Sequence, residues 1–125
     1  MKNLLTCLLL VLPLFAIAQQ SDLGKELVAI TSHGLLKNEM VEFDEASGIL
    51  SIGEFLIPVS TNTRVVKKKV KSVEFLLQNY TSITSKSDAS IRKAWHVMRF
   101  KSKESAQQFI DAFKKAAAVS VLGKT

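Results

Sequence analysis

The clearest pattern of apolar positions lies near the end of the chain. Apolar residues recur there at intervals of three and four, which places them on one face of a helix. They are Ala106, Phe109, Ile110, Phe113 and Ala117. Ser102 is a suitable N-cap, Glu104 favours the positive end of a helix, and Gly123 follows where a helix would stop. The spacing predicts an amphipathic helix from Ser102 to about Leu122 that covers a sheet with its phenylalanine face.

Two segments further upstream alternate in character with a period of two, which is typical of strands. One face of residues 94–101 carries Ala94, His96, Met98 and Phe100. One face of residues 73–80 carries Val73, Phe75 and Leu77. Both segments therefore predict strands that turn one face toward a core.

Shorter strands are predicted upstream of these two segments, between about residues 41 and 59. VEFD and GILSI flank a turn-like stretch from Glu45 to Gly48, which predicts a hairpin. The stretch from Glu54 to Val59 predicts another strand. Because it contains Pro58, this strand should lie at a sheet edge or have the proline at its end. We expect four to six strands before the terminal helix.

Residues 21–34 fit two interpretations. Ser21 is a possible N-cap, and the apolar residues that follow it share one helix face until Gly34. These apolar residues are Leu23, Leu27 and Ile30. The β-branched cluster in LVAIT fits a strand almost as well. We favour the helix.

Strands followed by one amphipathic helix predict the α+β class, with an antiparallel meander or small barrel. The segment WHVMRFKSKESAQQFIDAFKKA, residues 95–116, resembles the last strand and C-terminal helix of the pleckstrin-homology-like barrel superfamily. The resemblance implies a small barrel closed by that helix. Pleckstrin-homology domains proper carry a tryptophan in the helix, whereas here Trp95 lies in the preceding strand. The alternative fold is a ferredoxin-like α/β sandwich.

The first 18 residues have the parts of a cleavable secretory signal peptide. Lys2 supplies the positive charge, residues 4–15 supply the apolar core, and Ala16 and Ala18 form an A-x-A cleavage site. The end of this segment, FAIAQQ, resembles the signal-peptide ends of Gram-negative bacterial exported proteins. That resemblance implies a periplasmic or secreted protein.

The mature chain, residues 19–125, has the size of a single small domain, with its core within about residues 35–122. The one cysteine, Cys7, lies in the predicted signal peptide, so the mature domain has no disulfide. We also expect no transmembrane segment in the mature chain, because it has no apolar run of about 20 residues.

The full sequence has a net charge of +6, and charge is distributed unevenly along residues 19–125. Residues 19–57 contain two basic and seven acidic residues, a net charge of −5. Residues 58–125 contain 14 basic and four acidic residues, a net charge of +10. The second half is therefore the part suited to an anionic partner.

A basic run is the most distinctive polar feature. It consists of Arg64, Lys67, Lys68, Lys69 and Lys71. As a strand it would place Lys67, Lys69 and Lys71 on one face, a stripe suited to lipid headgroups, nucleic-acid phosphate or an acidic protein. Edge lysines also block unwanted strand pairing. We take Arg64, Lys67, Lys69 and Lys71 as candidate anion-binding residues. A second basic group comprises Arg92, Lys93, Arg99, Lys101 and Lys103.

Catalytic and metal-binding patterns are not found. His33 and His96 lie far apart in the sequence, and no G-x-S-x-G, P-loop or H-E-x-x-H motif occurs. We interpret His96 as a core or rim residue of its strand. We predict a non-catalytic exported binding module without cofactor or metal, whose partner is a protein or an anionic surface. The alternatives are a nucleic-acid-binding module and, third, a small hydrolase.

The export hypothesis makes a direct prediction. Protein recovered from the cell envelope should begin at Gln19, with or without cyclisation to pyroglutamate, because signal peptidase would cut after Ala18. Intact-mass analysis checks this, and a mass that retains Met1 would rule out cleavage.

Overall fold

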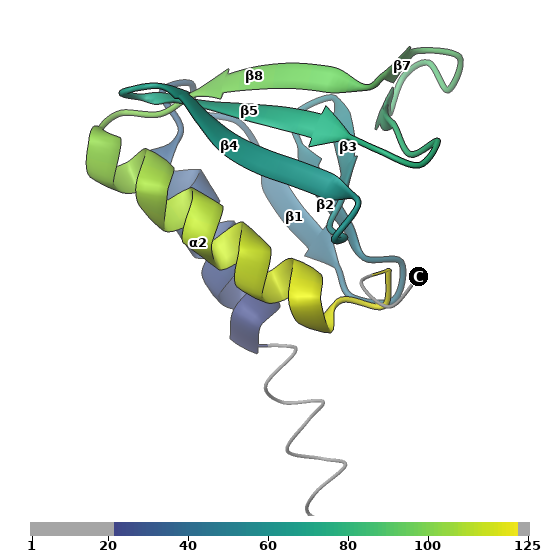
Figure 1. Ribbon diagram of the computed structural model, residues 1–125, viewed down its shortest axis with the longest axis horizontal. Helices are drawn as coiled ribbons and strands as arrows, with labels where there is room; N and C mark the ends of the chain where they lie inside the picture. The colour runs from purple at the N-terminus through teal and green to yellow at the C-terminus, as the bar shows by residue number, and fades with distance from the viewer. Residues whose placement is uncertain (1–21, 123–125) are drawn as a thin grey trace, which may run out of the picture.

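The computed structural model describes residues 22–122, which form one helix at each end of an uninterrupted run of eight strands (Figure 1). The N-terminal helix covers residues 22–34, and α2 covers Lys103–Val119. The strands are β1 (Val41–Asp44), β2 (Ile49–Ile52), β3 (Phe55–Pro58), β4 (Thr63–Lys69), β5 (Ser72–Leu77), β6 (Ile83–Ser85), β7 (Arg92–Lys93) and β8 (Trp95–Arg99). The predicted signal peptide, its cleavage site, Ser21 and Gly123 lie outside the described residues. The α+β class is confirmed.

The strands form two antiparallel sheets rather than one closed barrel. One sheet has the order β1-β2-β3-β6-β7, and the other has the order β4-β5-β8. Only Ala94 separates β7 from β8, so this stretch of chain leaves one sheet and enters the other. Within the described residues no strand of one sheet is paired with a strand of the other, so the two sheets do not close into the expected barrel. The ferredoxin-like alternative is wrong because no helix interrupts the strands, and the count of four to six strands was too low.

The predicted elements mostly keep their places. The hairpin of β1 and β2 is confirmed, and its turn contains Gly48 at a φ of +73°, a conformation that favours glycine. β3 ends at Pro58, as predicted for this proline. In β5, Val73 and Phe75 are buried on the predicted face.

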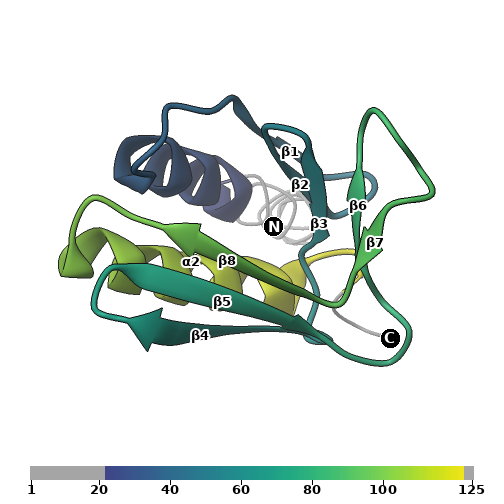
Figure 2. The ribbon, with the colours of Figure 1, turned by 90° about the horizontal axis from the view of Figure 1, so that it is seen from above.

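The helix interpretation of the first segment is confirmed, and the helix ends at Gly34 as expected. Its last carbonyl, that of Gly34, accepts a hydrogen bond of 2.7 Å from the Lys101 N–H, and the Leu36 N–H donates to the Arg99 carbonyl at 3.0 Å. A Cβ at Gly34 would lie only 3.0 Å from the Phe100 ring. The missing side chain therefore lets this helix end pack closely against the chain after β8, beside α2 (Figure 2).

Helix α2 begins as predicted and ends earlier. The Ser102 hydroxyl accepts a hydrogen bond from the Ser105 N–H at 3.0 Å, which confirms the N-cap. The prediction that the helix reaches Leu122 is wrong. Ser120 adopts an extended backbone, and its hydroxyl accepts from the Leu122 N–H at 3.3 Å, so this local bond replaces another helical turn.

Four phenylalanines form the centre of the core. The Phe75 ring of β5 lies 5.7 Å from the Phe109 ring and 5.9 Å from the Phe113 ring, both in edge-on arrangements. Phe100 lies 5.1 Å from Phe109. All four side chains are buried, so α2 is attached to the β4-β5-β8 sheet through aromatic contacts.

Truncation of the central helix residue tests this core. Phe109→Ala should lower the free energy of unfolding by about 3 to 5 kcal/mol, because the ring is fully buried between Phe75 and Phe100. Val119→Ala, at an exposed position of the same helix, should cost under about 1 kcal/mol. Denaturant titration measures both, and equal losses would contradict the assignment.

Candidate functional site

The candidate site lies on the β4-β5-β8 sheet. One face of this sheet meets α2 and includes Val65, Val73 and Phe75. The opposite, outer face is built from three cross-strand rows. These rows are Arg64, Leu76 and Trp95; Val66, Glu74 and Val97; and Lys69, Ser72 and Arg99.

A β-bulge changes the predicted lysine stripe. Lys67 is opposite Val73 and Lys69 is opposite Ser72, so one extra residue is inserted in β4. Lys67 therefore shares the helix-side face, Lys69 lies on the outer face, and Lys71 lies in the turn after the strand. The prediction that all three lysines share one face is wrong, because a bulge resets the alternation of side chains. β4 is an edge strand, as the lysines suggested.

The predicted residue Arg64 is separated from the lysines. It lies near the start of β4, opposite Leu76. Lys69 lies five positions further along the strand, a distance of roughly 16 Å at about 3.3 Å per strand residue. Arg64 therefore belongs to the Trp95 row of the outer face and not to the lysine cluster.

The two basic groups of the sequence meet at one end of this sheet. The Phe100 N–H donates to the Lys71 carbonyl at 2.7 Å, and Arg99 is paired with Ser72, so the end of β8 lies beside the β4–β5 turn (Figure 1). We call the five exposed cations gathered here the basic end. They are Lys67, Lys69, Lys71, Arg99 and Lys101. Val70, at the tip of the turn, is 61% exposed among them.

The rest of the second basic group is placed elsewhere. Lys103 is the first residue of α2 and is followed by Glu104, whose charge is opposite. Arg92 and Lys93 lie in β7 of the other sheet, where the Lys93 ammonium is 4.8 Å from the centre of the Phe55 ring. The sequence did not indicate this division, because it depends on which strands become neighbours.

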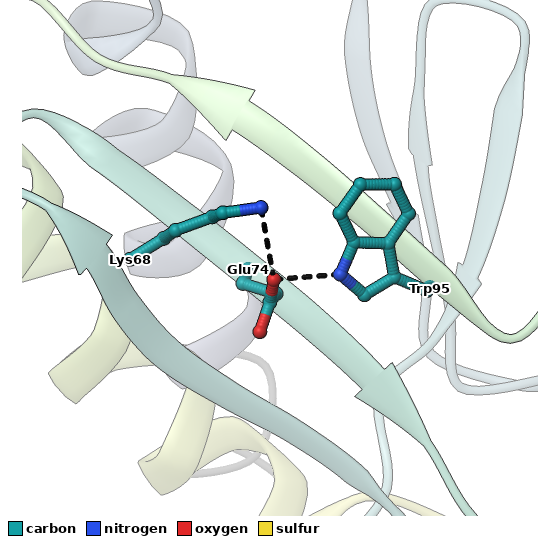
Figure 3. A network of polar contacts seen from close by, with 3 residues as sticks. All are labelled: Lys68, Glu74 and Trp95. Atoms are coloured by element: carbon teal, nitrogen blue, oxygen red, sulfur yellow. Dashed lines mark hydrogen bonds and ion pairs between the residues drawn. The ribbon is translucent and has the colours of Figure 1, made fainter.

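A polar network on the outer face fixes the single tryptophan (Figure 3). The Trp95 indole N–H donates to Glu74 Oε2 at 2.6 Å, and Lys68 Nζ lies 3.4 Å from the same oxygen. Lys68 Nζ also lies 4.7 Å from the centre of the Trp95 ring. Glu74 thereby neutralises Lys68, and Trp95 remains 50% exposed as an oriented aromatic surface. Sequence reasoning missed this network, since its three members come from three strands.

A cavity of about 400 Å³ lies between β8 and the β2–β3 hairpin, and His96 forms part of its wall. The His96 ring is half-buried, 4.6 Å from the Phe55 ring and 6.4 Å from the Phe75 ring. Burial, with a smaller contribution from the charge of Lys93, lowers the pKa of His96 below its ordinary value of 6.5. The imidazole is therefore neutral at pH 7.

Among residues 22–122, no three His, Cys, Asp or Glu side chains gather as a metal site would require. No helix in that range has the length and apolar character needed to cross a membrane. The comparisons add no relative: no protein-family model matches the chain, and neither curated proteins nor solved structures give a significant match.

The environment of His96 predicts a pH dependence of stability. Its folded pKa lies below its unfolded pKa, so the unfolded chain binds more protons between the two values. The free energy of unfolding should therefore fall as the pH is lowered from about 7 and level off below the folded pKa. Denaturant titrations at several pH values test this.

The matched variants are His96→Gln, which should flatten that part of the profile, and His33→Gln at an exposed position of the N-terminal helix, which should leave it unchanged. A wild-type profile that is already flat near pH 6 would contradict the assignment.

Proposed function

We propose that this protein is a non-catalytic exported binding module that docks on an anionic lipid surface through its basic end. The observation that carries the proposal is the convergence of two basic segments, distant in sequence, around the β4–β5 turn. The only ion pair among the described residues joins Lys68 and Glu74, so the five cations of the basic end have no carboxylate partner there.

The expected strength is that of a reversible contact. A Lys or Arg close to an anionic membrane contributes about 1 kcal/mol, so five such residues contribute at most about 5 kcal/mol. This free energy corresponds to a dissociation constant of roughly 0.2 mM. Weak binding of this kind requires several cations to reach one surface together, which the turn and the end of β8 allow.

The apolar tip favours lipid over nucleic acid. Val70 stands between Lys69 and Lys71 and is 61% exposed, so it can enter the boundary between headgroups and acyl chains while the lysines contact phosphate. A single-stranded nucleic acid would instead be expected to stack on Trp95, which lies two rows away from Lys69 on the outer face.

We also propose a variant of the pleckstrin-homology-like barrel for the fold and a periplasmic or secreted location for the protein. The fold proposal is supported by α2, which follows an uninterrupted run of strands and packs across the inner face of the β4-β5-β8 sheet. The location is supported by the signal-peptide pattern of the first 18 residues.

Reversal of the turn charges tests the lipid-surface proposal. Lys67→Glu, Lys69→Glu and Lys71→Glu together should reduce co-sedimentation with phosphatidylglycerol vesicles at least tenfold, because the charge of the contact surface changes sign. Stability should change by less than about 1 kcal/mol, since exposed charges contribute little to folding. Wild-type binding should also weaken strongly between about 50 and 200 mM salt.

The control is a second triple variant with the same change in net charge at exposed positions away from the basic end, Lys86→Glu, Lys114→Glu and Lys115→Glu. It should retain at least half of the binding. If both triple variants lose binding equally, or if phosphatidylcholine vesicles bind as well, the proposal is wrong. Preferential binding to single-stranded DNA would support the nucleic-acid alternative instead.

A further inference from the structure

A second site of different character lies where the two sheets fail to join. Its cavity of about 400 Å³ falls within the range of roughly 300 to 1,000 Å³ that is typical of small-molecule sites. Residues 35–40 close one end of it. This segment is hydrogen-bonded to both walls of the cavity. The Leu36 N–H donates to the Arg99 carbonyl of β8 at 3.0 Å, and the Gly53 N–H, in the turn between β2 and β3, donates to the Met40 carbonyl at 2.9 Å.

The walls of the cavity are mostly hydrocarbon. Four buried apolar side chains and one half-buried ring line it: Leu35, Ile52, Ile57, Met98 and Phe55. Such walls favour the apolar part of a ligand, because binding removes its hydrocarbon surface from water. The interior therefore suits a hydrocarbon chain better than a sugar or a nucleotide.

The rim carries more positive than negative charge. Lys37, Arg99 and one carboxylate, that of Glu39, line the opening. Neither Lys37 nor Arg99 has a carboxylate within salt-bridge distance among the described residues. The Lys93 ammonium over the Phe55 ring adds a third cation near the cavity. The rim thus complements an anionic group at the end of an apolar chain.

The free edge of β8 adds a neutral hydrogen-bond donor. The Ala94 carbonyl accepts from the Leu77 N–H at 2.9 Å, and the Phe100 N–H donates to the Lys71 carbonyl at 2.7 Å, so even-numbered residues turn their backbone groups toward β5. By the alternation of antiparallel strands, Val97 turns its N–H away from β5, toward the cavity that it lines.

We propose that this cavity binds a single-chain amphiphile with a carboxylate head, of the fatty-acid class. The hydrocarbon chain lies against Ile52, Ile57 and Met98, and the carboxylate lies at the rim near Lys37 and Arg99. This ligand site is distinct from the surface contact of the basic end, although Arg99 borders both.

Titration calorimetry with decanoate, below its micelle concentration, tests the site. Decanoate should bind at one molecule per protein, whereas 1-decanol and decyltrimethylammonium should bind at least tenfold more weakly, because they lack the anionic head. Lys37→Glu should weaken decanoate binding at least tenfold, and Lys115→Glu, exposed on α2, should leave it within twofold. Equal affinity for decanoate and decanol would overturn the proposal.

Two experiments distinguish this proposal from the lipid-surface proposal: a variant whose larger side chain fills the cavity, and NMR mapping of the residues that contact decanoate. Met98→Phe should abolish decanoate binding and retain vesicle binding, and circular dichroism verifies that it folds. The Lys67, Lys69 and Lys71 to Glu triple variant should do the reverse. In amide NMR spectra, decanoate should shift Val97 and residues 36–39 most. Largest shifts at residues 67–71 would place the ligand at the basic end and overturn the cavity site, as would retention of decanoate binding by folded Met98→Phe.

Discussion

The contact of Phe109 and Phe113 with Phe75 is the interaction on which the other features of this molecule depend. Residues 22–122 contain no cysteine, so no disulfide joins the sheets and the described fold relies on its apolar core and its hydrogen bonds. The aromatic contact anchors α2 to the middle strand of the β4-β5-β8 sheet. Because α2 covers one face of that sheet, the outer face is left to carry Trp95 together with Arg64, Lys69 and Arg99. The core thereby determines which side of the sheet can meet a partner.

Incomplete closure is the second constraint. A closed barrel would satisfy every strand edge with another strand, but here β8 ends its sheet and borders the cavity. The N-terminal helix and the segment after it partly replace the missing pairing. Gly34 is central to this replacement, since its small size allows the helix end to approach Phe100 closely. The same close approach places residues 35–40 at the end of the cavity. The packing of Gly34 on Phe100 therefore both stabilises the unpaired edge of β8 and shapes the cavity beside it.

Charge on this molecule is organised by backbone geometry more than by composition. The bulge in β4 sends Lys67 and Lys69 to opposite faces, and the β4–β5 turn brings Lys71 beside the end of β8. Lys68, the residue inserted by the bulge, forms an ion pair with Glu74, so it does not add to the free positive charge. Together the two side chains orient Trp95. The four lysines of one short run thus have four different surroundings.

The local patterns of the sequence determined most of the elements but not the short strands β6 and β7, because periodicity, capping and turn chemistry act between near neighbours. The helix begun by Ser102, the β1–β2 hairpin and the strand end at Pro58 were all predictable in this way. The tertiary structure alone decided which strands pair, where the two sheets remain unpaired and where the bulge lies. The Glu74 contact of Trp95, the union of the two basic groups and the cavity beside His96 all depend on those long-range pairings. Strand neighbours are set by burial of the whole core, and no short stretch of sequence carries that information.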